Sequence, residues 1–144
     1  KKPIVILLPG IMGSFLERND KNIWINYLNF VIGGLKNIAI DKNGVKATGL
    51  IKTSYKDLGA YLEVNYDVVT FPFDWRLSLT EAGNQLNSKI TALMQYKQPI
   101  KLVGHSMGGL VIRELMVNHT ATWQQLNTQN DFITVLLGTP WMGS

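Results

Sequence analysis

The sequence contains no cysteine, and charged residues make up only 17% of its 144 positions. Without cysteine, disulfide bridges and thiolate metal sites are excluded, and nothing indicates the redox compartment. No apolar run approaches the length of a membrane-spanning helix, and the longest, such as Ile4 to Leu8, are strand-sized. The sequence opens at Lys1 with neither a Met nor a signal peptide, so it indicates no localisation.

Positive charge is also sparse. The 14 Lys and Arg residues exceed the 10 Asp and Glu residues by only four, and they are scattered singly or in pairs. The absence of a basic stripe with interleaved aromatic residues argues against nucleic-acid binding. A mild attraction to an anionic membrane surface is compatible with this charge. No segment resembles a metal site, a P-loop or a dinucleotide fingerprint, so we expect no cofactor. The oligomeric state is not indicated.

What the sequence does contain is a regular alternation of apolar segments. Its length suits one domain with one core over residues 1–144. Apolar runs predict strands, and spacings of three and four predict amphipathic helices between them. The strands are expected at 4–8, 66–71, 100–103 and 132–137, and the helices at 55–63, 79–93 and 107–118. This order predicts an α/β fold, with a parallel sheet and flanking helices.

Two local signals refine this outline. Ser78 and Glu81 have the spacing of a capping box, which predicts a helix start. Residues 15–53 lack the regular alternation, and we interpret them as an insertion at the edge of the core. Within them, 23–27 is expected to form a short helix or strand, and Asn43-Gly44 is a hairpin signal.

The segment Gly104-His105-Ser106-Met107-Gly108 matches the G-x-S-x-G nucleophile elbow, between a predicted strand and a predicted helix. An elbow serine sits on a tight turn that side chains two positions away would crowd, which explains Gly104 and Gly108. Gly109 would let the helix approach the sheet. The simpler interpretation is a tight turn that contains a serine by chance, and the strand-helix context favours Ser106 as a nucleophile.

Such a turn places the serine at a helix N-terminus, where backbone N–H groups favour a developing negative charge. The Met107 N–H is therefore a candidate oxyanion donor. A second donor is expected from the loop after the first strand, Pro9 to Ser14, where a backbone amide can reach the site. We predict that Ile11 supplies it.

Four segments, in this order, resemble the lecithin:cholesterol acyltransferase-like α/β-hydrolases, which include bacterial lipase-like members. They are Pro3-Ile4-Val5-Ile6-Leu7-Leu8-Pro9-Gly10-Ile11-Met12-Gly13-Ser14, Phe71-Pro72-Phe73-Asp74-Trp75-Arg76, Gly104-His105-Ser106-Met107-Gly108-Gly109 and Leu137-Gly138-Thr139-Pro140. The Asp-Trp-Arg element separates this family from generic lipases. The resemblance implies that Ser106 attacks a lipid ester and that the acyl group passes to water or an alcohol. It also implies oxyanion roles for Met107 and Ile11.

The resemblance further implies a catalytic acid and a histidine after later strands, and the chain stops at Ser144 before either position. We therefore expect a fragment, truncated at both ends, of a longer serine hydrolase or acyltransferase; the alternative is that another chain supplies the base. His105 should point away from Ser106. His119 lies about 20 Å farther along a helix, too far for a hydrogen bond. Two other functions stay open: a thioesterase or small-ester hydrolase, and a non-catalytic lipid- or protein-binding module.

Three further sites have plain structural interpretations beside functional ones. Asp74 is expected to pair with Arg76 or cap a turn rather than act in catalysis. Trp75 is expected to pack. Trp141 and Met142 follow the fourth strand, where an apolar wall would suit a lipid chain, and ordinary core packing is an equal alternative.

Overall fold

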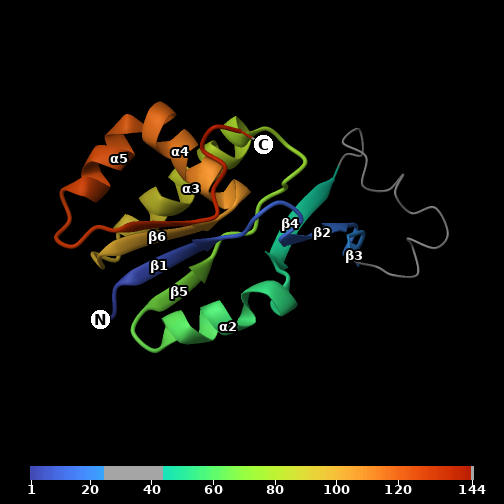
Figure 1. Cartoon of the computed structure of the whole chain (residues 1–144), viewed down its shortest axis with the longest axis horizontal. Helices are drawn as coiled ribbons and strands as arrows, with labels where there is room; N and C mark the ends of the chain where they lie inside the picture. The colour runs from blue at the N-terminus through green and yellow to red at the C-terminus, as the bar shows by residue number, and fades with distance from the viewer. Residues whose placement is uncertain (25–43, 144) are drawn as a thin grey trace.

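The computed structural model describes residues 1–24 and 44–143, and its centre is a parallel sheet (Figure 1). The four-stranded sheet has the order β5-β1-β6-β7. Its strands are β1 (Ile4–Leu8), β5 (Asp67–Thr70), β6 (Ile100–His105) and β7 (Thr134–Leu137). All three neighbouring pairs are parallel. The predicted α/β class is confirmed. The first predicted strand has the observed bounds, and the other three differ from the observed strands by one or two residues at one or both ends.

The strand order creates a switch point in the middle of the sheet. β1 lies between β5 and β6, with Ile6 paired to Val69 on one side and to Leu102 on the other. The chain leaves β1 toward β5, whereas it leaves β6 in the opposite direction, toward β7. Ligands in open α/β sheets bind beyond the carboxyl ends of strands at such a point. The two loops that meet there follow β1 and β6.

Helices cover both faces of the sheet (Figure 1). α2 (Lys52–Glu63) lies on one face, and α3 (Leu79–Met94), α4 (Met107–Asn118) and α5 (Thr120–Asn127) lie on the other. The helices predicted at 55–63, 79–93 and 107–118 are confirmed. α5 is an additional helix that the sequence analysis did not predict.

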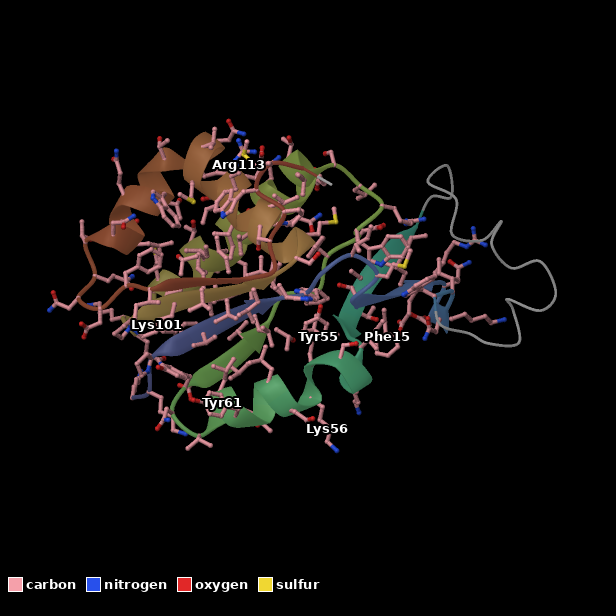
Figure 2. All side chains as sticks on the ribbon, viewed as in Figure 1. Phe15, Tyr55, Lys56, Tyr61, Lys101 and Arg113 are labelled. Carbon is pink, nitrogen blue, oxygen red and sulfur yellow. The ribbon has the colours of Figure 1, made fainter. Side chains whose placement is uncertain are left out.

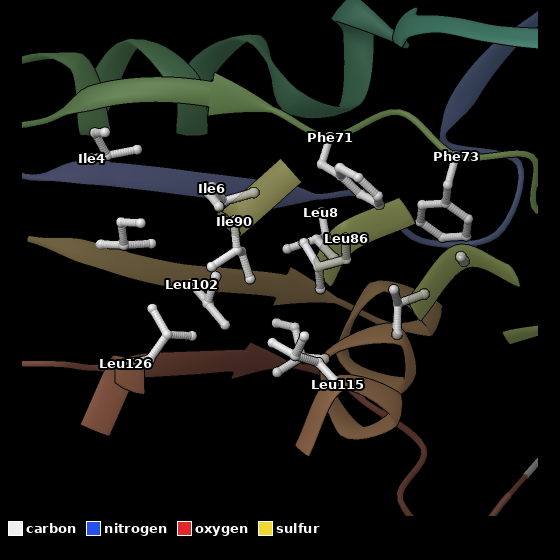
Figure 3. Packing of buried hydrophobic residues seen from close by; sticks show 14 residues of the cluster. Ile4, Ile6, Leu8, Phe71, Phe73, Leu86, Ile90, Leu102, Leu115 and Leu126 are labelled. Carbon is white, nitrogen blue, oxygen red and sulfur yellow. The ribbon is translucent and has the colours of Figure 1, made fainter. Parts of the chain in front are cut away.

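Each face has its own hydrophobic cluster. The larger lies between the sheet and α3, α4 and α5 (Figure 3). It includes Ile4, Ile6, Leu8, Phe71, Phe73, Leu86, Ile90, Leu102, Leu115 and Leu126. The smaller joins Val5, Leu7, Tyr55, Leu62 and Val103 beneath α2. Since successive strand side chains alternate between faces, β1 contributes to both clusters, and all five of its residues are buried.

The start of α3 follows the predicted capping pattern. Ser78 Oγ accepts a hydrogen bond from the Glu81 N–H at 3.2 Å. This satisfies one of the helix's free amides. The predicted apolar face is also confirmed, since Leu86 and Ile90 are fully buried. The helix ends at Met94, before Pro99, and Gln95 caps it.

A second sheet occupies part of the region interpreted as an insertion. Three antiparallel strands have the order β3-β2-β4. They are β2 (Ser14–Arg18), β3 (Lys21–Asn22) and β4 (Val45–Leu50). The segment 23–27 and the Asn43-Gly44 hairpin signal fall largely outside the described residues. Within the part of the chain that the structure describes, no helix is long and apolar enough to cross a membrane.

Candidate active site

Ser106 lies on a one-residue turn between β6, which ends at His105, and α4, which begins at Met107. Its φ of 51° and ψ of −119° form a conformation that costs a non-glycine residue free energy. Two backbone hydrogen bonds hold the turn. The Ser106 N–H donates to the Leu137 carbonyl at 2.8 Å, and the Gly109 N–H donates to the Ser106 carbonyl at 3.0 Å. The strand-turn-helix context that the motif requires is therefore present.

Glycines allow the chain to pack tightly around this turn. A Cβ on Gly104 would lie 2.8 Å from the Gly109 nitrogen, so α4 and β6 touch here, as predicted. A Cβ on Gly108 would lie 2.6 Å from the carbonyl oxygens of Leu8 and Pro9, which end β1. These distances are shorter than real Cβ contacts, so a side chain would force the backbone apart.

The loop after β1 packs directly against the elbow. A Cβ on Gly10 would lie 3.1 Å from Ser106 Cβ and 3.0 Å from His105 Nδ1. The loop turns sharply at Met12, which has a φ of 59°, and the Gly13 N–H donates to the Gly10 carbonyl at 3.0 Å. The structure thus brings the two predicted oxyanion segments to one place.

Both predicted oxyanion donors have a free amide. Among residues 1–24 and 44–143, the Ile11 and Met107 N–H groups donate to no other group. Met107 is the first residue of α4, so the helix provides no acceptor for its amide. One of these amides follows Ser106 directly and the other follows Gly10, which packs against Ser106 Cβ, so both are candidates to bind an anionic oxygen at the serine. The catalytic roles of Ser106, Met107 and Ile11 stay predictions.

Hydrogen bonds that involve side chains connect the loop after β1 to more distant segments. The Gly10 N–H donates to the Tyr55 hydroxyl at 2.7 Å, at a buried position. Ser14 is fully buried, and its Oγ accepts from the Phe73 N–H at 3.1 Å. Trp24 Nε1 donates to the Met12 carbonyl at 3.1 Å. The sequence interpretation gave Tyr55, Ser14 and Trp24 no role in the site.

Tyr55 links this loop to the elbow. It lies between the start of α2 and the carboxyl end of β1 (Figure 2). Its hydroxyl is 2.9 Å from His105 Nδ1, and the two rings meet edge to face. Burial raises the pKa of Tyr55, and the hydrogen bond from the Gly10 amide opposes part of that shift. The hydroxyl therefore stays protonated at neutral pH.

Neither histidine of the sequence is placed to deprotonate Ser106. The Nδ1 atom of His105 is directed to Tyr55, as expected for a side chain that points away from the nucleophile. His119 follows the twelve-residue helix α4, which separates it from Ser106 by about 20 Å. Within the described residues, the Ser106 hydroxyl has no hydrogen-bond partner.

The Asp74–Arg76 ion pair is confirmed. Asp74 Oδ1 accepts from the Arg76 Nε at 2.8 Å, and Oδ2 lies 2.5 Å from Nη2. Asp74 also accepts from the Arg76 backbone N–H at 3.1 Å, which closes a local turn. The bond to Asp74 raises the pKa of Arg76. Both side chains are at least nine-tenths buried. Because both carboxylate oxygens bond to Arg76, we interpret Asp74 as a residue that stabilises this turn.

Trp75 is partly buried, whereas Trp141 and Met142 are exposed. Trp75 packs against the larger cluster and meets Trp24 edge to face, with ring centroids 5.1 Å apart, which confirms the packing interpretation. Met142 is fully exposed, and Trp141 is 42% exposed. Neither side chain is buried within the described residues, and their role as substrate contacts stays a prediction. Trp141 lines a cavity of about 280 Å³ with Met116, Trp123, Phe132 and Leu136.

A parallel sheet with helices on both faces, and a strained serine between strand and helix at its switch point, define an α/β-hydrolase. Residues 44–144 match the family model for lecithin:cholesterol acyltransferase, and the chain belongs to this family. Membership implies a lipid acyltransferase or esterase kind of function. Comparison with curated proteins gives no match. The matched range contains the elbow and the Asp-Trp-Arg element, and it does not include the loop after β1.

Proposed function

We propose that this protein cleaves lipid esters through an acyl-enzyme formed on Ser106, and that it passes the acyl group to water or to an alcohol. One observation carries the proposal. Ser106 is held in a strained conformation, with the loop after β1 packed against its Cβ. Backbone strain of this kind persists where the surrounding structure imposes it, and it occurs preferentially at functional sites.

In the proposed reaction, Ser106 Oγ attacks the ester carbonyl carbon while a general base takes its proton. The carbonyl oxygen becomes an oxyanion, which the N–H groups of Met107 and Ile11 stabilise. Collapse of this intermediate expels the alcohol, which takes up the proton, and leaves the acyl group on Ser106. Water or another alcohol then attacks the acyl carbon, and the same sequence of steps frees the serine.

The general base is a separate part of the proposal. His105 is bonded to Tyr55, and His119 lies at the far end of α4. We propose that a histidine outside these 144 residues serves Ser106, oriented by an acidic residue. Loss of a base leaves oxyanion stabilisation in place, so the chain alone would retain only residual activity.

Apolar groups near the site favour a lipid substrate. Ile11 and Met12, on the loop that contacts Ser106, are 56% and 46% exposed. Family membership implies the same substrate class. We propose Trp141 and Met142 as further substrate contacts, because both leave apolar surface exposed beyond β7. Exposed apolar side chains beside a nucleophile would also favour contact with a membrane surface.

The test is ester cleavage by the protein with any natural flanking sequence, compared with Ser106→Ala. Substrates would be phospholipid vesicles with long acyl chains, a soluble short-chain ester and an acyl thioester. We expect release of long-chain fatty acid, a transient acyl adduct on Ser106 by peptide mass, and loss of both in the variant. Preference for the short ester or the thioester would identify the alternative hydrolases. Vesicle binding without turnover, unchanged by Ser106→Ala, would identify a binding module and contradict the proposal.

A further inference from the structure

We infer that Tyr55, together with His105, is a positioning residue that sets the oxyanion loop against the nucleophile. This inference rests on the proposed function of Ser106. Tyr55 belongs to α2, outside both loops of the site, yet its hydroxyl touches each of them. Tyr55 therefore joins the loop after β1 to the elbow through one oxygen atom.

The first contact is with the loop. The hydroxyl accepts the Gly10 N–H at 2.7 Å, and Gly10 is followed directly by Ile11, the proposed oxyanion donor. A Cβ on Gly13 would lie 2.9 Å from the same hydroxyl. The oxygen therefore sits inside the turn formed by residues 10–13. The Gly10 carbonyl, which accepts from the Gly13 N–H at 3.0 Å, lies in the same planar peptide group as the Ile11 N–H, so a turn held in place also orients that N–H.

The second contact is with the elbow. The Tyr55 hydroxyl already accepts the Gly10 N–H, so its own proton is available for His105 Nδ1, 2.9 Å away. This arrangement favours the His105 tautomer that carries its proton on Nε2. If Nδ1 carried the proton instead, the hydroxyl hydrogen would have no acceptor among the described residues.

The geometry joins these contacts into one chain: Gly10 N–H to the Tyr55 hydroxyl, and the hydroxyl to His105, the neighbour of Ser106. Each end of the chain is one residue from a proposed catalytic group. Tyr55 is buried, with only 7% of its surface exposed, so its ring position is fixed by packing beneath the sheet. A fixed hydroxyl between two loops holds them in register, which oxyanion stabilisation requires.

The first test is Tyr55→Phe, which removes only the hydroxyl, compared with Tyr61→Phe on the same helix, where Tyr61 is 76% exposed. We expect about a tenfold fall in kcat with KM changed less than twofold, because the oxyanion forms only in the transition state. Tyr61→Phe should match the wild type. Equal kcat in all three proteins would overturn the inference while leaving the proposed function intact.

The second test examines His105 by conservative replacement. The Asn side chain can place an amide oxygen where Nδ1 lies, so His105→Asn should retain more of kcat than His105→Ala. Equal losses in both variants, with the Gly10 amide still protected, would contradict a positioning role for His105.

A third measurement needs no turnover. In wild type we expect slow hydrogen exchange at the Gly10 amide, and in Tyr55→Phe at least tenfold faster exchange there, with the β6 amides unchanged. Unchanged Gly10 exchange would overturn the inference even if Ser106 proved unreactive. Faster exchange with an unreactive wild-type Ser106 would support the contact and reject only the proposed function.

Discussion

The two loops that meet at the candidate site are held by different means. The elbow depends on backbone hydrogen bonds of Ser106 and Gly109 and on side chains that are absent at Gly104 and Gly108. The loop after β1 depends largely on side chains that are present: Tyr55, Ser14 and Trp24. Substitutions that add atoms should therefore destabilise the elbow, whereas substitutions that remove atoms should destabilise the loop.

The largest expected effect is from an atom added to the elbow. In Gly108→Ala, the methyl group would lie 2.6 Å from two backbone carbonyl oxygens at the end of β1, which cannot rotate away. We expect the free energy of unfolding in urea to fall by about 3 kcal/mol.

The matched control is Gly59→Ala in α2, where a Cβ would meet nothing within 4 Å. It should raise stability by about 0.5–1 kcal/mol, because alanine favours a helix interior. A Gly108→Ala protein as stable as wild type would show that the elbow does not depend on this close packing.

The next largest loss of stability is expected when an atom is removed where the loop ends, at Ser14, the first residue of β2. Ser14→Ala deletes the acceptor of the buried Phe73 N–H. The unpaired amide should cost about 1–3 kcal/mol in chemical denaturation. Ser88→Ala, which removes an exposed helical hydroxyl, is the control and should change stability by less than about 0.5 kcal/mol. Equal effects of the two substitutions would refute the claim that side chains hold the loop.

A smaller change in stability would test whether the backbone at Ser106 is strained. Ser106→Gly should stabilise the fold by about 1 kcal/mol, because glycine adopts a φ of 51° without steric cost. Ser106→Ala keeps a Cβ and hence the strain, so its melting temperature should stay near that of wild type. If Ser106→Gly melts no higher than Ser106→Ala, the turn stores no strain.

The smallest effect is a dependence of stability on alkaline pH. Burial raises the pKa of Tyr55 above its ordinary value of 10.0. The folded state therefore holds this proton more tightly than the unfolded state, and the resulting stability is complete below pH 10 and is lost as pH rises above it. Urea unfolding of wild type and Tyr55→Phe should show a stability difference that is constant up to about pH 9 and decreases above pH 10. A difference independent of pH would contradict burial as the cause.

The same contrast explains how much the sequence could predict. The parallel sheet, the helices and the elbow follow from local patterns: the apolar run of β1, the period of α3 and the glycines around Ser106. The glycine pattern also predicted that the helix approaches the sheet closely at Gly109. The support of the other loop comes from Tyr55 and Phe73, which are 45 and 59 positions from their partners. No local period encodes such pairings, because tertiary packing alone selects them.

Trp141 and Met142, which follow β7, show a second limit of prediction from sequence. The apolar side chains of Trp141 and Met142 are compatible with either a core or a lipid-facing wall. Whether they are buried depends on the residues that pack beside them. The isolated pattern therefore left both interpretations open, and in the described structure Met142 is exposed while Trp141 is partly covered. The Asp74–Arg76 pair was predictable because its partners are two residues apart.

The most direct test of the central claim is reaction of the protein, with any natural flanking sequence, with a fluorophosphonate probe. Intact mass and peptide mapping would locate the adduct, and Ser106→Ala would be the control. We expect one adduct, on Ser106, that is absent in the variant. A folded protein that forms no adduct at Ser106, or that is labelled equally in Ser106→Ala, would contradict the assignment of Ser106 as the nucleophile.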